Sequence, residues 1–189
     1  MNTVLTDRFE DKNRGGFFLT GDGHEELLVR EKPMYDGAEP AGTSVAILNL
    51  LRLHEFTTDP QYRTQAENAL RFAAPTLKSN PISLSEMLLA LDFLLDRPKQ
   101  IVIVIPRGAG KDEAAPLLSA FRRRFVPNRV LSVVRDGQEQ EMVARIIPLV
   151  RGKVAVGGRA TAYVCEERTC MTPTGNPAEF LEQVGSAQS

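Results

Sequence analysis

The spacing of hydrophobic positions divides this chain into two parts. Up to residue 97, most apolar residues recur at intervals of three and four, which is the spacing of amphipathic helices. From Pro98 onward, short apolar runs alternate with helical patterns. We therefore expect two domains, one over residues 1–97 and the other over residues 98–189.

A β-hairpin is predicted near the start of the first domain. Phe17–Thr20 and Leu27–Arg30 have the composition of its two strands, and Gly21-Asp22-Gly23 suits the turn because glycine adopts positive φ without penalty. Three helices with short connections follow, over about residues 45–56, 60–77 and 83–95. Such helices pack as antiparallel neighbours.

The second domain reads as alternating strands and helices. Ile101–Ile105 is continuously apolar and β-branched, as expected for a strand covered on both faces. Two further strands are predicted over residues 129–134 and 160–165, with helices over 113–125, 138–150 and 178–184. Crossover helices of this length imply parallel pairing, so the fold class is α/β, with a small three-layer parallel unit after the helical part.

Composition narrows the function classes. The chain has 23 Lys+Arg and 24 Asp+Glu, hence a net charge of −1. Binding to nucleic acid or to an anionic membrane requires an excess of positive charge, so we expect neither as a partner. No apolar run approaches the length of a membrane span, and the first residues lack the apolar core of a signal peptide. With only two cysteines, these features predict a cytoplasmic protein.

Two motifs suggest cofactors that we do not expect. Gly108-Ala109-Gly110-Lys111 follows a buried strand, but Ile105 and Asp112 stand where a phosphate loop has Gly and Ser or Thr, so we predict an ordinary turn. Cys165 and Cys170 lack the spacing of a redox pair and have no nearby histidine. We predict structural thiols there, with a regulatory disulfide or a metal as the alternative. No cofactor and no metal site are predicted.

The polar stretch between His24 and Pro40 is the candidate for a binding pocket, because it leads into the start of a buried helix. Asp36 and Glu39 could divide acid and base roles if their surroundings separated their pKa values. A loop held by salt bridges, joining hairpin to helix, is the alternative.

Signatures at both ends of the chain resemble one family. It comprises the thioredoxin-domain-containing proteins related to spermatogenesis-associated protein 20, whose activity is poorly defined. The resemblance implies an N-terminal thioredoxin-like domain, then an (α/α)6 toroid similar to six-hairpin glycosidases and sugar epimerases, then an α/β extension. This chain would hold only the last toroid helices and the extension. The matching residues are Gly15-Gly16-Phe17-Phe18, His24-Glu25, Arg30-Glu31-Lys32, Asp36–Pro40, Ser44-Val45, Asn49–Leu53, Ala160–Glu166, Thr169-Cys170 and Pro173.

Three functions follow as expectations. In the first, the chain is the C-terminal region of such a protein and is non-catalytic alone. In the second, the intact toroid binds or modifies a sugar-like ligand, and its substrate-binding residues are Arg30, Lys32, Tyr35, Asp36 and Glu39. In the third, the chain is a partner-binding module that uses Arg122-Arg123-Arg124, although a solvated helix face explains these arginines as simply.

A partial toroid also implies a partner. Three helices and a hairpin cannot close a ring of six helical hairpins, so the helix over 45–56, apolar on several sides, should expose a hydrophobic patch. We therefore expect self-association or association with the missing N-terminal part.

Overall fold

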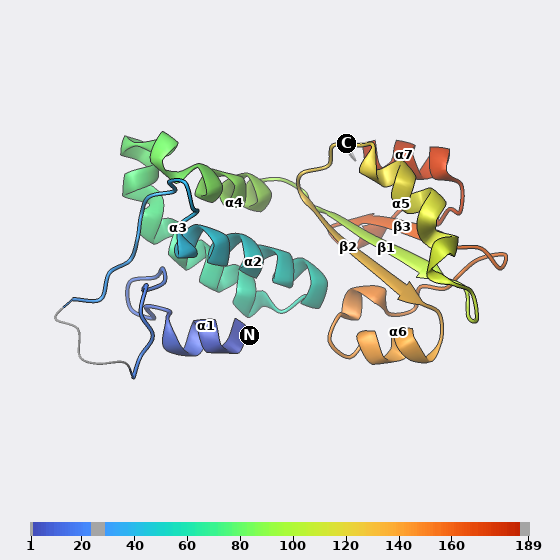
Figure 1. Cartoon of the computed structure of the whole chain (residues 1–189), viewed down its shortest axis with the longest axis horizontal. Coiled ribbons are helices and arrows are strands. Elements are labelled where there is room, and N and C mark those ends of the chain that lie inside the picture. The colour runs from blue at the N-terminus through green and yellow to red at the C-terminus, as the bar shows by residue number, and fades with distance from the viewer. Residues whose placement is uncertain (1, 24–28, 186–189) are drawn as a thin grey trace. The chain divides into compact units, whose positions relative to one another are not determined.

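The computed structural model describes residues 2–23 and 29–185 (Figure 1). It forms two compact units. The first consists of Met1–His54 and Asp59–Leu95, and the second of Glu55–Thr58 and Asp96–Ser189. Each unit is described by itself.

The first unit is helical. The predicted start of its longest helix is confirmed, because Pro60 is the first helical residue and the Asp59 carboxylate accepts a hydrogen bond from the Gln61 amide at 2.9 Å. The elements are α1 (Asn2–Arg8), α2 (Gly42–Thr57), α3 (Pro60–Ser79), the 3-10 helix η1 (Pro81–Leu84) and α4 (Ser85–Leu95).

The predicted β-hairpin is wrong for the described residues. Phe17 forms a single isolated bridge with Glu10, and Phe18–Thr20 has no strand partner; the second predicted strand, Leu27–Arg30, lies partly outside the described residues. The Leu19 amide does donate to the Glu31 carbonyl at 2.8 Å, so the two arms meet there. Positive φ angles at Gly15 and Gly16 turn the chain back, and the Phe18 amide donates to the Phe9 carbonyl at 2.8 Å, so the first arm lies against the segment after α1.

Helix α2 does not carry the predicted hydrophobic patch. Helix α2 is buried on more than one side, and Val45 is exposed among its large apolar residues. Besides Val4, Leu19, Val29 and Tyr35 on other segments, four large apolar side chains are exposed on η1 and α4. They are Ile82, Leu88, Leu89 and Leu95, with exposed fractions of 87%, 38%, 55% and 77%. We call these four residues the α4 surface.

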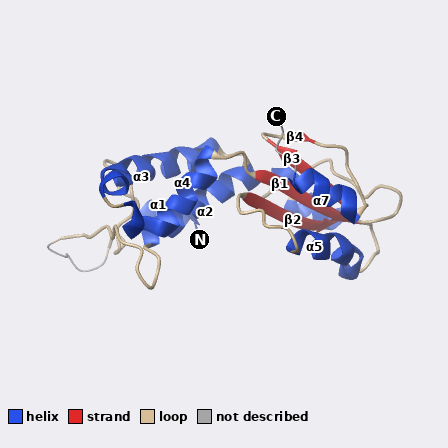
Figure 2. Cartoon of the chain, turned by 90° about the horizontal axis from the view of Figure 1, so that it is seen from above, coloured by secondary structure: helices blue, strands red, loops and turns tan. Residues whose placement is uncertain are grey.

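The second unit has three layers around a four-stranded sheet of order β2-β1-β3-β4 (Figure 2). Helices α5 and α7 cover one face of the sheet, and α6 lies on the other (Figure 1). Ile101, Ile103 and Ile105 pack with Phe121 and Phe180 on the first face. The elements are β1 (Lys99–Ile105), η2 (Lys111–Ala114), α5 (Ala115–Arg122), β2 (Arg129–Arg135), α6 (Gln138–Val143), η3 (Pro148–Val150), β3 (Thr161–Glu166), β4 (Thr169–Cys170) and α7 (Pro177–Gly185).

The prediction of an all-parallel sheet is wrong. Strands β1 and β2 are parallel, but β3 runs antiparallel to β1. The predicted helix over 138–150 ends at Val143, and Pro148 opens the separate 3-10 turn η3. A six-residue helix rises about 9 Å, whereas a seven-residue strand spans about 23 Å. Helix α6 does not carry the chain back to the end of the sheet where β1 and β2 begin, so β3 starts at the end where β2 finishes and runs antiparallel to β1.

The two cysteines form a disulfide, so the prediction of structural thiols is wrong; of the alternative, the disulfide bond is present. Cys165 and Cys170 face each other across the β3–β4 hairpin. Glu167 and Arg168, both with positive φ, form the two-residue turn between the strands. The register of β3 and β4 and the turn between them together bring the two sulfur atoms within bonding distance.

The Gly108–Lys111 segment is the strand-to-helix turn that the sequence predicts. Gly108 has a positive φ of 80°, which a glycine tolerates without strain. Asp112 and Glu113 occupy the first turn of η2, where their negative charges would disfavour a bound phosphate.

Candidate functional site

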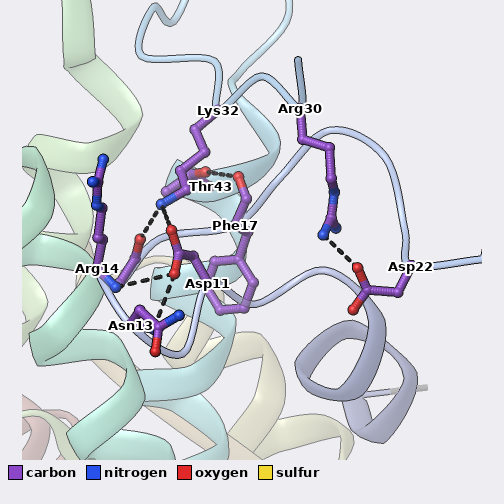
Figure 3. A network of polar contacts seen from close by, with 9 residues as sticks. Asp11, Asn13, Arg14, Phe17, Asp22, Arg30, Lys32 and Thr43 are labelled. Atoms are coloured by element: carbon purple, nitrogen blue, oxygen red, sulfur yellow. Dashed lines mark hydrogen bonds and ion pairs between the residues drawn. The ribbon is translucent and has the colours of Figure 1, made fainter. Parts of the chain in front are cut away.

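The most enclosed ion pair in the described part of the first unit joins Lys32 and Asp11. The Lys32 ammonium donates to Asp11 Oδ2 at 2.5 Å and to the Gly15 carbonyl at 2.7 Å, and the two side chains are only 9% and 12% exposed (Figure 3). The same carboxylate accepts from the backbone amides of Asn13 and Arg14 through Oδ1. The Lys32 ammonium and the Asp11 carboxylate therefore both have ion-pair and hydrogen-bond partners within the protein.

Glycines at positions 15 and 16 allow this segment to lie close to α3. A Cβ at Gly15 would lie 2.5 Å from the Asn68 carbonyl oxygen, and one at Gly16 would lie 3.0 Å from the Phe72 ring. Since both residues also have positive φ, larger side chains there would push the segment away from α3. The Lys32 ammonium would then lose its hydrogen bond to the Gly15 carbonyl.

Aromatic rings complete the surroundings of the two cationic side chains. The Lys32 ammonium lies 4.2 Å from the Phe72 ring centroid and 4.8 Å from that of Phe18, and the Arg30 guanidinium carbon lies 4.0 Å from the Phe18 centroid. These are cation–π distances. Arg30 also pairs with Asp22 and donates to the Thr20 carbonyl at 2.6 Å.

These groups line an open hollow of 780 Å³, which we call the Phe18 hollow. Two polar atoms of the segment, Thr20 Oγ1 and Arg30 Nε, are buried and have no hydrogen-bond partner among the described residues. Both atoms are shielded from solvent, and Thr20 does not line the hollow, so the groups that could meet a molecule there are the lining side chains. The lining residues are Asp7, Glu10, Asp11, Lys12, Asn13, Arg14, Phe18, Asp22, Arg30, Lys32 and Phe72.

Two carboxyl groups in the hollow have pKa values shifted in opposite directions. The hydrogen bond from Lys32 lowers the pKa of Asp11, against a smaller opposing effect of burial. Burial raises the pKa of Glu10, which Lys12 and a hydrogen bond from Gln65 only partly offset. The hollow thus offers one firmly ionised carboxylate and one more easily protonated carboxyl group.

Asp36 occupies a different place, at the starts of two helices. Its Oδ1 accepts from the Ala41 amide at 2.8 Å, just before α2. Its Oδ2 accepts from the amides of Glu86 and Met87 in the first turn of α4, at 2.9 and 3.2 Å. The side chain is buried, and its negative charge faces the positive ends of both helices.

The five predicted substrate-binding residues therefore separate into groups. Arg30 and Lys32 share the Phe18 hollow, Asp36 holds helix ends, and Tyr35 and Glu39 are exposed. His24-Glu25-Glu26, at the start of the predicted polar stretch, lies outside the described residues.

Asp11, Phe18 and Phe72 are parts of the site that the sequence did not predict. Asp11-x-x-x-Gly15-Gly16 was the available signal, because an acid followed by paired glycines is typical of a tight turn closed by a carboxylate.

Comparison with curated proteins identifies relatives over nearly the whole chain. The human protein named spermatogenesis-associated protein 20 is 35% identical over 176 residues, which is 91% of this chain and 22% of that protein. Its mouse counterpart is 34% identical over 173 residues, again 91% of this chain and 22% of the relative. These identities support the spermatogenesis-associated protein 20 family. An uncharacterised protein of Caenorhabditis elegans is 32% identical over 90% of this chain and 22% of its own length.

This chain spans about a fifth of the length of the relatives it matches. No family model and no solved structure matches it. The name of the human and mouse relatives assigns no reaction, so chemistry must be argued from the residues themselves.

The described part of the chain contains neither a membrane-spanning helix nor a metal-binding cluster. None of its helices combines the length and apolar character that crossing a bilayer requires. Within residues 2–23 and 29–185, no three His, Cys, Asp or Glu side chains gather as a metal site would require.

Proposed function

We propose that this chain is the C-terminal portion of a longer protein of the spermatogenesis-associated protein 20 type, and that it is non-catalytic by itself. Its first unit would supply the last helices of an α/α toroid and pack through the α4 surface against the helices that precede them. The single observation that carries this proposal is the exposure of Ile82, Leu88, Leu89 and Leu95.

The arrangement of these residues fits a packing surface. Leu88 and Leu95 are seven positions apart and so lie on the same side of α4, with Leu89 beside them. The backbone amide of Asp36 donates to the Ser83 carbonyl at 2.7 Å, which ties the loop before α2 to η1. Monomeric proteins rarely leave such apolar groups uncovered together.

The relatives are long enough to contain further helices that could pack on the α4 surface. The matched segment is 22% of the human protein, so more than three quarters of that protein lies outside the match. In this proposal, the thioredoxin-like domain and the other toroid helices that the resemblance implies belong to that remainder.

Replacing two residues of the α4 surface tests this proposal. Ile82→Glu with Leu89→Glu should reduce self-association of the isolated chain in light scattering and reduce binding of an apolar dye, because both side chains are exposed. Circular dichroism should stay unchanged. Met142→Glu on α6 is the matched control, since Met142 is also 55% exposed, and it should change neither signal. A wild-type chain that is monomeric and binds no dye would contradict the proposal.

A second candidate function is binding of a small polar ligand, sugar-like in chemistry, in the Phe18 hollow. The charged and polar side chains that line the hollow favour it, because a polyhydroxylated molecule offers both donors and acceptors to them. The face of the Phe18 ring supplies an apolar wall of the kind that sugar rings contact.

Chemical-shift mapping with a panel of neutral hexoses tests this second function. Millimolar hexose should shift the amide signals of Phe18, Thr20 and Arg30, and Arg30→Ala should abolish the shifts. Arg63→Ala is the matched control, because Arg63 makes its ion pair on the exposed surface of α3. No shift with any hexose, or equal shifts in Arg30→Ala, would refute sugar binding at the hollow.

A further inference from the structure

The second unit carries a separate pocket of 310 Å³ at the edge of the sheet where β1 and β2 begin. Its apolar floor comes from Val126 and Val184, which are buried in the core beneath. Arg97, Arg124 and Phe125 also line it. We call it the Phe125 pocket. It shares no residue with the Phe18 hollow or the α4 surface.

The acidic groups of this pocket already have partners. Glu166 pairs with Lys99, and these side chains are only 6% and 11% exposed. Asp96 Oδ2 accepts a hydrogen bond from Asn128 Nδ2 at 2.8 Å. Since both carboxylates are satisfied within the protein, the charges left to meet a ligand are those of the arginines.

Two arginines of the pocket are available to a ligand. Arg97 has only a 4.0 Å contact with Glu167, in which both side chains are more than half exposed. The Arg124 guanidinium lies over Gly185, where a Cβ would come within 2.4 Å of its Nη2 atom. Glycine at position 185 therefore gives this guanidinium room beside the end of α7. The sequence from Ser119 to Arg135 holds no acid to neutralise it.

Phe125 stands beside these arginines with 89% of its surface exposed, the largest exposed fraction among the large apolar side chains described. Exposed aromatic residues next to arginine are typical of the few positions that dominate protein interfaces. A solvated helix face explains three arginines, but it does not explain a fully exposed phenylalanine at the rim of a pocket.

We propose that the Phe125 pocket binds an acidic peptide segment of a partner protein. An aliphatic or aromatic side chain of that segment would pack against Phe125 and Val126, and flanking carboxylates would pair with Arg124 and Arg97. The pocket suits a peptide better than a single-stranded nucleic acid, because it offers only one ring on which bases could stack. This surface is independent of the function proposed above.

Selection from a random peptide library displayed on phage tests the inference with the full chain. Enriched peptides should carry Asp or Glu on both sides of one large apolar residue. A synthetic peptide of that consensus should bind wild type, and Arg124→Glu or Phe125→Ser should weaken binding about tenfold or more. Neither variant removes a buried side chain, and thermal unfolding of each variant verifies that the fold is intact.

Matched controls separate the pocket from general attraction of charge. Arg145→Glu makes the same charge change at an exposed residue that does not line the pocket, and Met142→Ser removes an exposed apolar side chain from α6. Both should bind like wild type. Three results would overturn the proposal: a library without an acidic consensus, equal binding by Arg124→Glu and wild type, or tighter binding of single-stranded RNA than of the peptide.

Discussion

Asp36→Ala should destabilise the first unit by about 4 kcal/mol, the largest effect of any substitution considered for this chain. The substitution leaves the amides of Ala41, Glu86 and Met87 without their acceptor, in a buried place that water reaches poorly. It also removes the charge that stabilises the starts of α2 and α4. Urea denaturation followed by circular dichroism measures the loss.

Two further variants make this result specific. Asp36→Asn retains one acceptor oxygen, so it should cost about half as much. Glu39→Ala, three residues away and exposed, should change the stability by no more than about 0.5 kcal/mol. Equal, small effects of Asp36→Ala and Glu39→Ala would show that Asp36 does not hold the two helices.

Lys32→Met should cost about 3 kcal/mol of unfolding free energy, because it leaves the enclosed Asp11 carboxylate without its cation. Methionine retains the apolar stem beside Phe72, so lost packing contributes little. Arg63→Met, which breaks the exposed pair with Glu67, should cost no more than about 0.5 kcal/mol in the same urea experiment. Similar losses in the two variants would contradict the importance of burial.

The dependence of stability on pH gives a second readout for the same pair. Lys32 lowers the pKa of Asp11 in the folded state, so the ionised carboxylate favours folding. This contribution is present above the ordinary pKa of an aspartate and is lost as pH falls through the lowered value. Lys32→Met should therefore flatten the acid side of the stability curve. The raised pKa of Glu10 acts in the opposite direction. Because Glu10 is present in both proteins, its contribution to the pH dependence of stability cancels when they are compared.

The sequence predicted best what depends on near neighbours. The helices α2, α3 and α4 appear where periodicity and capping residues place them, and the Asp59 cap is a contact over two residues. The direction of β3 depends on where the chain returns after α6, which no single segment encodes. Pro148 was the available sign that the preceding helix ends early.

In the candidate site, too, the sequence predicted residues close together in the chain but not the contacts between distant segments. Lys32 and Arg30 were predicted from a polar stretch, but Asp11 lies 21 positions before Lys32, and Phe72 reaches the hollow from α3. Asp36 was predicted as an acid or base, or as part of a loop held by salt bridges. Its oxygens instead meet amides of residues 41, 86 and 87, a contact across 50 positions that only the packed helices create.

The most direct test of the central claim is amide hydrogen exchange of this chain with and without the remainder of the human relative, produced separately without the matched segment. If the α4 surface is a packing surface for that remainder, exchange in Pro81–Leu95 should slow when it is added, and Ile82→Glu with Leu89→Glu should abolish the protection. Unchanged exchange in Pro81–Leu95 with wild-type chain, at concentrations where the remainder is folded, would contradict the claim.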